Sequence, residues 1–207
     1  MSKFIALGVC ASVTLLSACS GGSTSYISTG FASLSGTSIP VSLRNEVNGG
    51  VTSTSVGRAA YVAGTNDSGM VAQAGFRTTS VGTAVTSGTA TYVTTYDYIV
   101  ADDLEVNDSL LTGVYGYETG TVSLAADFDA GTLTGSTSQI SVDGDISGTD
   151  LSGSVTTTYD FFAVGDNYSG SVTTSLDGEI GSTGVIGAFH GSDGNTAVAG
   201  ALVGGRL

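Results

Sequence analysis

Residues 121–155 read TVSLAADFDAGTLTGSTSQISVDGDISGTDLSGSV, and apolar and polar side chains alternate along this stretch without a helical period. Successive side chains of a strand point to opposite faces, so such alternation predicts strands with one buried face. The apolar face of the first strand would hold Val122, Leu124, Ala126 and Phe128. Gly131 lies where the first hairpin turn is expected, because glycine adopts positive φ without steric cost. The stretch therefore predicts a β-meander.

The composition of all 207 residues is that of an all-β chain. Glycine occurs 32 times and proline once, and lysine and arginine together number only 5. Threonine, valine and tyrosine are common, and these residues favour strands. The apolar share of 41% is ordinary for a folded protein, and its alternation is not expected of a disordered tract. The length suits one domain and a targeting segment.

The chain is acidic, with a formal net charge of −13. Nucleic acid binding requires a basic surface, so it is not expected here, and contact with anionic membrane surfaces is disfavoured for the same reason. One interpretation of the charge is that it keeps a polar β surface soluble and prevents pairing of strand edges. The alternative is an acidic face that steers a basic partner.

The N-terminus has the pattern of a secretory signal. Lys3 precedes an apolar run over residues 4–16 that is too short to span a bilayer. Residues 15–19, LLSAC, resemble the bacterial lipobox. That resemblance implies cleavage before Cys19, diacylglyceryl transfer to its thiol and acylation (palmitate) of the new amine, which together anchor a protein firmly. The alternative is an ordinary soluble secretory signal with a chance cysteine.

The expected organisation is a lipoprotein signal peptide over residues 1–18, a lipidated cysteine and tether over 19–50, and a β-barrel domain over 51–207. Cys10 would leave with the signal, so the mature chain could form no internal disulfide. Residues 20–25, SGGSTS, have the composition of a flexible tether. Residues 30–34 are a candidate edge strand. Serine rather than aspartate after Cys19 favours delivery to the outer membrane, by resemblance to enterobacterial sorting rules.

Residues 54–63 and 70–78 predict a hairpin, and residues 89–101 predict a longer strand. That strand carries Tyr92, Tyr96 and Tyr98 on one side. These tyrosines fit a core or rim stack whose hydroxyls reach water, and a ligand-binding wall is the alternative.

Residues 102–120 are expected to form the longest acidic loop. Its carboxylates lack the spacing of a calcium loop with a fixed glycine and a terminal glutamate, so a solvated loop is expected rather than a metal site. Further strands are expected over residues 168–177, 184–191 and 196–203. The resulting eight or nine strands are enough to close on themselves and remove open edges.

Several short motifs follow the order seen in a known family. They comprise residues 92–98, ADFD at 126–129, TLTG at 132–135, VDGDI at 142–146, LSG at 151–153, GAFHG at 187–191 and AG at 199–200. Together they resemble the barrel of bacterial transferrin-binding protein B over residues 88–203. The resemblance implies an eight-stranded antiparallel barrel on a lipid-anchored surface protein.

The sequence also departs from this family. His190 stands where the family commonly has a tyrosine, and one further C-terminal strand is usual in the family. Residues 54–78 are therefore expected to complete the barrel. With neither a second lobe nor a separate handle domain expected, transferrin binding is not expected to carry over, because a fold alone does not determine a ligand.

Catalytic chemistry is not expected, and neither is a cofactor or a metal. Asp127 with Asp129, and Asp143 with Asp145, have the spacing of a carboxylate pair, but aspartate at turns normally binds loop backbone. His190 is the only histidine. It is interpreted as structural, and the alternative is a ligand to haem or metal.

The sequence leads to two functional hypotheses for a monomeric, lipid-anchored outer-membrane protein. In the first, the barrel loops bind a protein or iron-source partner, with Tyr92, Tyr96, Tyr98 and His190 as candidate ligand-binding residues. In the second, the barrel is a structural envelope component that binds no diffusing ligand. A membrane-embedded barrel is disfavoured, because its outer strand faces carry Ser, Thr and Asp where lipid requires an apolar band.

Overall fold

The computed structural model describes residues 45–66, 69–107 and 110–207, and every regular element in these ranges is a β-strand. The strands are β1 (Asn45–Ser53), β2 (Gly57–Asn66), β3 (Gly69–Thr78), β4 (Thr89–Asn107), β5 (Leu110–Asp127), β6 (Thr132–Ser136), β7 (Ile140–Ser147), β8 (Asp150–Ala163), β9 (Asp166–Ile180), β10 (Gly184–Asp193) and β11 (Thr196–Arg206). Within the described ranges, no helix is long and apolar enough to cross a membrane.

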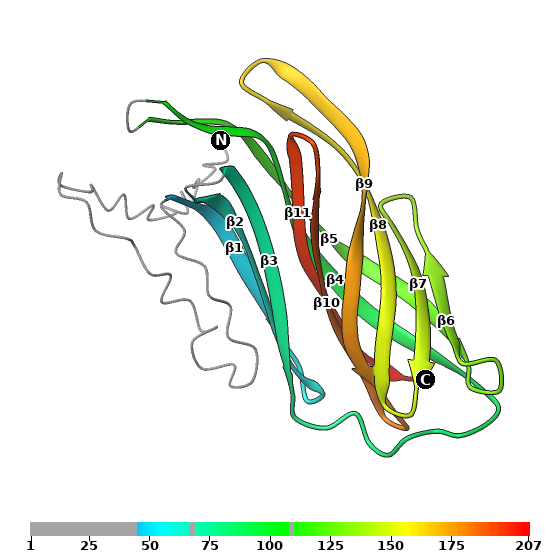
Figure 1. The fold of residues 1–207 in the computed structure, drawn as a ribbon. Coiled ribbons are helices and arrows are strands. Elements are labelled where there is room, and N and C mark those ends of the chain that lie inside the picture. The colour runs from blue at the N-terminus through cyan, green and yellow to red at the C-terminus, as the bar shows by residue number, and fades with distance from the viewer. Residues whose placement is uncertain (1–44, 67–68, 108–109) are drawn as a thin grey trace, which may run out of the picture.

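Strands β4 to β11 close into a barrel in the order β10-β11-β4-β5-β6-β7-β8-β9 (Figure 1). Every neighbouring pair is antiparallel, including β9 with β10, which closes the ring. The expected eight-stranded antiparallel barrel is therefore confirmed. We call the end that carries the β4–β5, β8–β9 and β10–β11 turns the upper end, and the opposite end the lower end.

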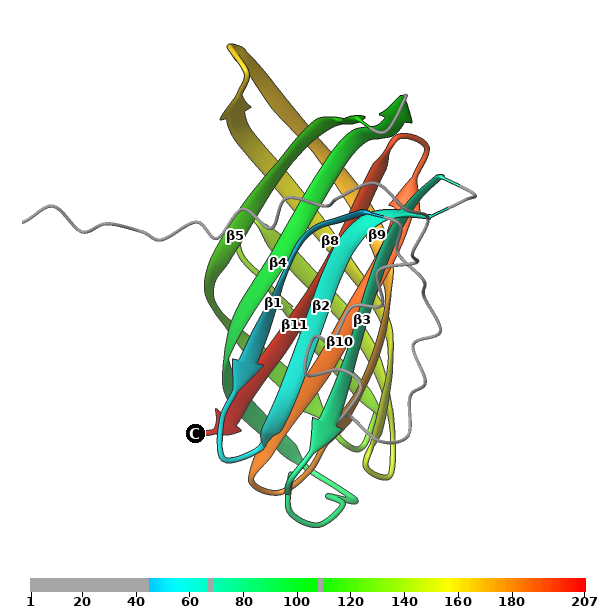
Figure 2. The same cartoon turned by 90° about the vertical axis from the view of Figure 1, so that its left-hand side faces the viewer.

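Strands β1 to β3 form a separate three-stranded sheet outside the barrel. Figure 2 shows this sheet lying over β10, β11 and β4. The expectation that residues 54–78 complete the barrel is therefore wrong. The ring closes without these residues because β9 pairs with β10 and β11 pairs with β4. The first described strand starts at Asn45, within the range expected to be tether.

Residues 102–120 were expected to be a loop, and this expectation is also wrong. Strand β4 runs on to Asn107 and β5 begins at Leu110, so most of the range is a paired hairpin. A bulge lies between Asp102 and Glu105, where Asp103 has a φ of 50°. Apolar residues interleave with the acids here, and the long β4–β5 ladder continues through them. Cross-strand pairing thus outweighs the polar composition that suggested a loop.

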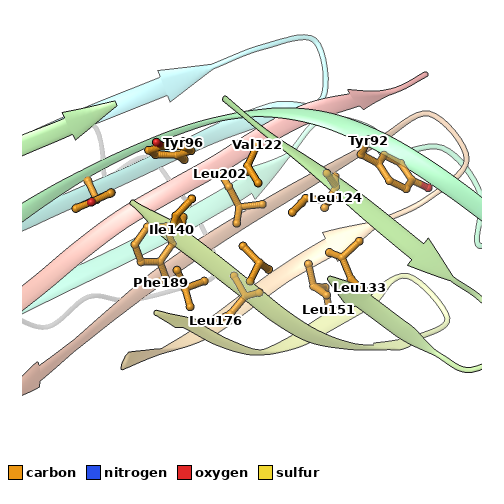
Figure 3. Close-up of a cluster of buried hydrophobic side chains, with 14 of the residues drawn as sticks. Tyr92, Tyr96, Val122, Leu124, Leu133, Ile140, Leu151, Leu176, Phe189 and Leu202 are labelled. Atoms are coloured by element: carbon orange, nitrogen blue, oxygen red, sulfur yellow. The ribbon is translucent and has the colours of Figure 1, made fainter. Parts of the chain in front are cut away.

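The barrel interior is filled by large side chains from all eight strands. Figure 3 shows these side chains converging from opposite walls. The fully buried members include Tyr92, Tyr98, Leu124, Leu133, Ile140, Leu151, Ile180 and Phe189. Eight strands leave an interior that side chains can fill or that can hold one small ligand, and here side chains occupy it.

Glycine makes this dense packing possible, because several aromatic rings lie across a glycine of a paired strand. A Cβ atom on Gly120 would come within 2.5 Å of the Tyr96 hydroxyl, and one on Gly170 within 2.6 Å of the Tyr159 hydroxyl. Several glycines are thus sites of close ring approach rather than signs of disorder.

A second apolar cluster joins the outer sheet to the barrel. It contains Ala59, Tyr61 and Ala63 of β2 and the outward residues of β4, β10 and β11, among them Ile99, Ile186, Ala199, Ala201 and Val203. The Tyr61 side chain hydrogen bonds to Asp97, and burial followed by this carboxylate raises the pKa of Tyr61. Small alanine side chains let the two layers approach closely, so the outer sheet is packed on the barrel rather than tethered to it.

Candidate binding surface

The three candidate tyrosines share one side of β4, as predicted, and that side faces the barrel interior. Tyr92 and Tyr98 are fully buried and Tyr96 is nearly so. The Tyr92 hydroxyl donates to the Gly181 carbonyl at 2.7 Å. The Tyr98 hydroxyl lies 3.0 Å from the Thr158 carbonyl, and burial raises the pKa of Tyr98. These rings fill part of the core, and the hydroxyls of Tyr92 and Tyr98 bind backbone carbonyls. The rings are not exposed to solvent.

His190 lies apart from the tyrosines, on the outer face of β10. Desolvation lowers its pKa, although a hydrogen bond to the Ala72 backbone and the charge of Asp177 act in the opposite direction. The hydroxyl of Ser175 donates to the His190 carbonyl at 3.2 Å. The candidate ligand-binding residues are therefore not brought together, because Phe189 and not His190 faces the tyrosines.

The aspartate pairs take structural positions. Asp127 Oδ1 accepts the amides of Asp129 and Ala130 at 3.0 Å each, as expected of a turn aspartate. Asp129 Oδ2 accepts the Gly88 amide at 3.1 Å. Asp143 and Asp145 lie exposed on the outer face of β7. Across the described ranges, no group of three or more His, Cys, Asp or Glu side chains could hold a metal ion.

Cys19 and the candidate edge strand at residues 30–34 lie outside the described residues. A groove of about 750 Å³ opens near the C-terminal end of β11, lined by residues that include Thr89, Ala125, Thr134 and Arg206. Its walls are mainly threonine and alanine, with Asp127 and Arg206 as the charged residues of the lining.

A long ribbon at the upper end is the most distinctive surface feature. Strand β7 pairs with β8 only as far as Thr157, and β10 pairs with β9 only as far as Ser175. Above these points β8 and β9 continue as a ladder with each other. At its base the Thr158 amide still donates to the Gln139 carbonyl and Gly191 of β10 lies against Thr174, and the rest extends beyond the neighbouring strands. Figure 1 shows this β8–β9 ribbon projecting past the rim of the barrel.

Aromatic rings line the inner face of the ribbon. The Phe161 ring stacks on Tyr168 with centroids 5.6 Å apart, and it lies 5.9 Å from the Tyr159 ring. Phe161 also crosses Gly116 of β5, where a Cβ atom would lie 2.7 Å from the ring. These contacts are worth about 0.5–1.5 kcal/mol for each aromatic pair beyond burial, so the base of the ribbon is held in place.

Hydrogen bonds tie the ribbon to the β10–β11 turn. The Tyr159 hydroxyl lies 3.3 Å from Thr196 Oγ1, which donates to Asp102 Oδ1 at 2.6 Å. Asn195 Nδ2 donates to Asp103 Oδ1 at 2.5 Å. The three upper hairpins are thereby joined at their bases, while the ribbon tip extends past them.

The tip of the ribbon is apolar and exposed. Phe162 is 70% exposed and Val164 is 87% exposed, and Val164 has a φ of 51° next to Gly165. Positive φ at a β-branched residue is an uncommon, strained conformation. Large exposed apolar side chains on a projecting element are typical of contact sites.

Charge is unevenly distributed along the barrel. Acidic residues gather toward the upper end, among them Asp102, Asp103, Asp160, Asp166 and Asp193. The arginines of the described ranges, Arg58, Arg77 and Arg206, all lie toward the lower end. The upper end is therefore acidic as well as apolar at its tip.

This surface was not predicted from the sequence. Its one usable signal was the run at residues 160–165, DFFAVG, in which two phenylalanines and a valine meet a turn glycine. An apolar run at a hairpin turn breaks the expected alternation, and an exposed contact site is one physical reason for such a break.

No family model matches the chain, and no curated protein matches its sequence. Two solved structures of the vaccine antigen transferrin-binding protein B from Haemophilus parasuis Hp5 are similar. A tryptophan-to-alanine variant gives a TM-score of 0.48 at 13% identity, covering 77% of this chain and 37% of that chain. A double variant, with a tyrosine also replaced, gives 0.45 at 13% identity with the same coverage.

The chain thus spans 37% of the length of these structures. These are similarities to structures of the protein that the sequence motifs resemble.

Proposed function

We propose that this protein is a lipid-anchored outer-membrane lipoprotein whose barrel is a non-catalytic binding module for a protein or iron-source partner. One observation carries the proposal: side chains fill the barrel interior, whereas the upper end displays a projecting ribbon with an exposed apolar tip. Because side chains fill the interior, a partner would have to bind on the exterior of the barrel. An apolar, partly aromatic exterior surface is suited to a macromolecular partner.

The lipid anchor in this proposal is carried by the lipobox-like residues 15–19 alone. The test is metabolic labelling of cells with a palmitate analogue, comparing the natural chain with Cys19→Ala. Incorporation that depends on Cys19 supports the anchor. Equal labelling of both chains, or of neither, contradicts it.

Surface display is tested separately by adding protease to intact cells and to cells whose outer membrane has been opened. Digestion on intact cells supports presentation of the ribbon to external partners. Protection until the membrane is opened contradicts the receptor role.

The second candidate is a structural envelope lipoprotein that binds no diffusing ligand. The filled interior favours this candidate as well, because a spacer needs a rigid core and no pocket. The two candidates differ in one observable: the structural role predicts an envelope defect on deletion, and growth that does not depend on any external partner.

A further inference from the structure

The upper part of β9 has an open strand edge. Strand β10 pairs with β9 only over residues 175–180, so residues 166–174 have a partner on the β8 side alone within the described ranges. Such an edge presents a row of backbone N–H and C=O groups that can pair with another chain.

The hydrogen-bonding pattern of the β8–β9 ladder shows which backbone N–H and C=O groups of β9 point away from β8. The Thr158 amide donates to the Gln139 carbonyl, away from β9, whereas the Ile180 amide donates to the carbonyl of Thr149, the residue just before β8. Even-numbered residues of β9 therefore bond to β8, and odd-numbered ones direct their N–H and C=O groups away. The outward groups belong to Asn167, Ser169, Ser171 and Thr173.

This edge lacks the features that protect strand edges. Residues 166–174, DNYSGSVTT, contain no lysine and no proline, their one charge is Asp166 at the end next to the turn, and the β8–β9 register runs without a bulge. The side chains of Asn167, Ser169, Ser171 and Thr173 are exposed. Natural edges are usually blunted by charge, proline or a bulge, so an unprotected edge is suited to pairing.

Strand β5 also has an unpaired edge above Ala125. There, however, the Phe161 ring lies across Gly116 and occupies the approach. The edge of β9 is the more accessible of the two.

We propose that residues 166–174 of β9 form a strand-addition site for an extended, basic segment of a partner protein. The inference rests on the proposed binding role and names its partner chemistry. Main-chain pairing would supply affinity, and alternate side chains would supply selectivity. We infer a basic segment because acids gather at the upper end whereas the arginines of the described ranges lie toward the lower end, and like charge disfavours pairing with a second copy of this acidic chain.

The first test is hydrogen exchange with mass spectrometry on the full mature chain, in detergent where it is lipidated. The probe is an extended peptide of alternating arginine and valine, matched in length to residues 166–174. We expect slower exchange of the β9 amides over 166–174. A peptide with glutamate in place of arginine should give none.

The outer wall supplies a matched control surface. Asp143, Asp145 and Asp177 lie exposed on β7 and β9 below the ribbon, among fully paired strands. A peptide attracted by charge alone would collect there. Slower hydrogen exchange of the amides in that wall, without slower exchange over residues 166–174, would overturn the proposal.

The second test uses substitutions that distinguish the backbone from the side chain. Ser169→Pro removes an outward N–H but leaves the β8 ladder intact, and we expect about tenfold weaker peptide binding. Ser169→Ala keeps the N–H and should bind like the natural chain. Asp160→Pro alters the opposite edge of the same ribbon, where Asp160 pairs with Ser169, and should retain most of the binding.

Equal binding by Ser169→Pro and Ser169→Ala would overturn the proposal, provided that both unfold at the same urea concentration. If Ser169→Pro does not fold, the exchange map of the natural chain decides alone. Neither the hydrogen exchange nor the peptide binding depends on Cys19. A labelling result that shows no lipid anchor would therefore contradict the proposed function without affecting this site. An unprotected β9 in a palmitoylated, surface-displayed protein would contradict the site alone.

Discussion

Gly200→Ala tests whether the barrel interior is as closely packed as the structure indicates. Gly200 lies in β11 between its two register partners, Phe189 of β10 and Tyr98 of β4. A Cβ atom placed there would lie 2.4 Å from Phe189 Cζ and 2.5 Å from the Tyr98 Cβ. Carbon atoms pack best at about 3.5–4.0 Å, so one of the two neighbours must move.

The cost of the added methyl group should be about 1–3 kcal/mol of unfolding free energy, because both neighbours are fully buried. Gly205→Ala on the same strand is the matched control. Its nearest atom would be the Thr183 carbonyl oxygen at 3.9 Å, which is ordinary contact. Loss of backbone freedom in the unfolded chain should then stabilise the control by about 0.4–1 kcal/mol.

The assay is urea unfolding followed by circular dichroism and tyrosine fluorescence, since the chain has no tryptophan. We expect Gly200→Ala to unfold at lower urea than the natural chain, and Gly205→Ala at equal or higher urea. Adding Phe189→Leu to Gly200→Ala should recover part of the loss, with a coupling energy of about 0.5–3 kcal/mol. Equal midpoints for the two alanine variants would refute the claim of a filled interior.

Three further predictions concern the core and the histidine. Tyr98→Phe removes the hydroxyl that bonds to Thr158 and should cost about 0.5–1.5 kcal/mol in urea unfolding. Leu133→Ala should cost about 2–5 kcal/mol, whereas the half-exposed Val93→Ala should cost much less; similar costs would contradict the assigned faces. Desolvation lowers the pKa of His190 in the folded chain, so the unfolded chain binds a proton first and stability should fall as pH drops below about 6.5. Urea midpoints above and below that pH should show a smaller fall for His190→Gln than for the natural chain.

The polar wall of the barrel could be predicted from the sequence because each strand there has one buried face. Strand β7 alternates buried and exposed residues along most of its length, and β9 does so between Tyr168 and Gly178. Alternation of apolar and polar residues with a period of two is the sequence pattern of a strand with one buried face. The fold class, the meander and the shared side of the β4 tyrosines followed from it.

The outer sheet could not be placed in the same way. Strand β3 has an apolar residue at every second position from Met70 to Phe76, and β2 is buried without a break from Ala59 to Thr65. Neither pattern tells a strand which neighbour it will pair with. The acidic hairpin of β4 and β5 was missed for another reason. Its carboxylates suggested solvent, yet its strands continue a long ladder above the barrel rim.

The candidate site was missed because an unpaired strand edge does not change the pattern of apolar and polar residues in the sequence. Whether β9 has one neighbour or two above Ser175 depends on where β10 ends, which is a property of the assembled sheet. His190 and the tyrosines attracted attention by residue type, and the structure assigns them to the outer face of β10 and to the interior core.

The apolar character of β11 shows how the barrel divides its outer surface. Nine consecutive residues from Thr196 to Gly204 are buried, although a barrel strand open to water would expose every second one. The outer sheet accounts for this by covering β10, β11 and β4, while β7 to β9 keep a polar outer face. A partner that needs apolar contact and free backbone finds neither on the polar wall nor beneath the outer sheet. The β8–β9 ribbon offers both together, with Phe162 and Val164 exposed beside the unpaired edge of β9, which makes that ribbon the place where binding to this barrel should first be sought.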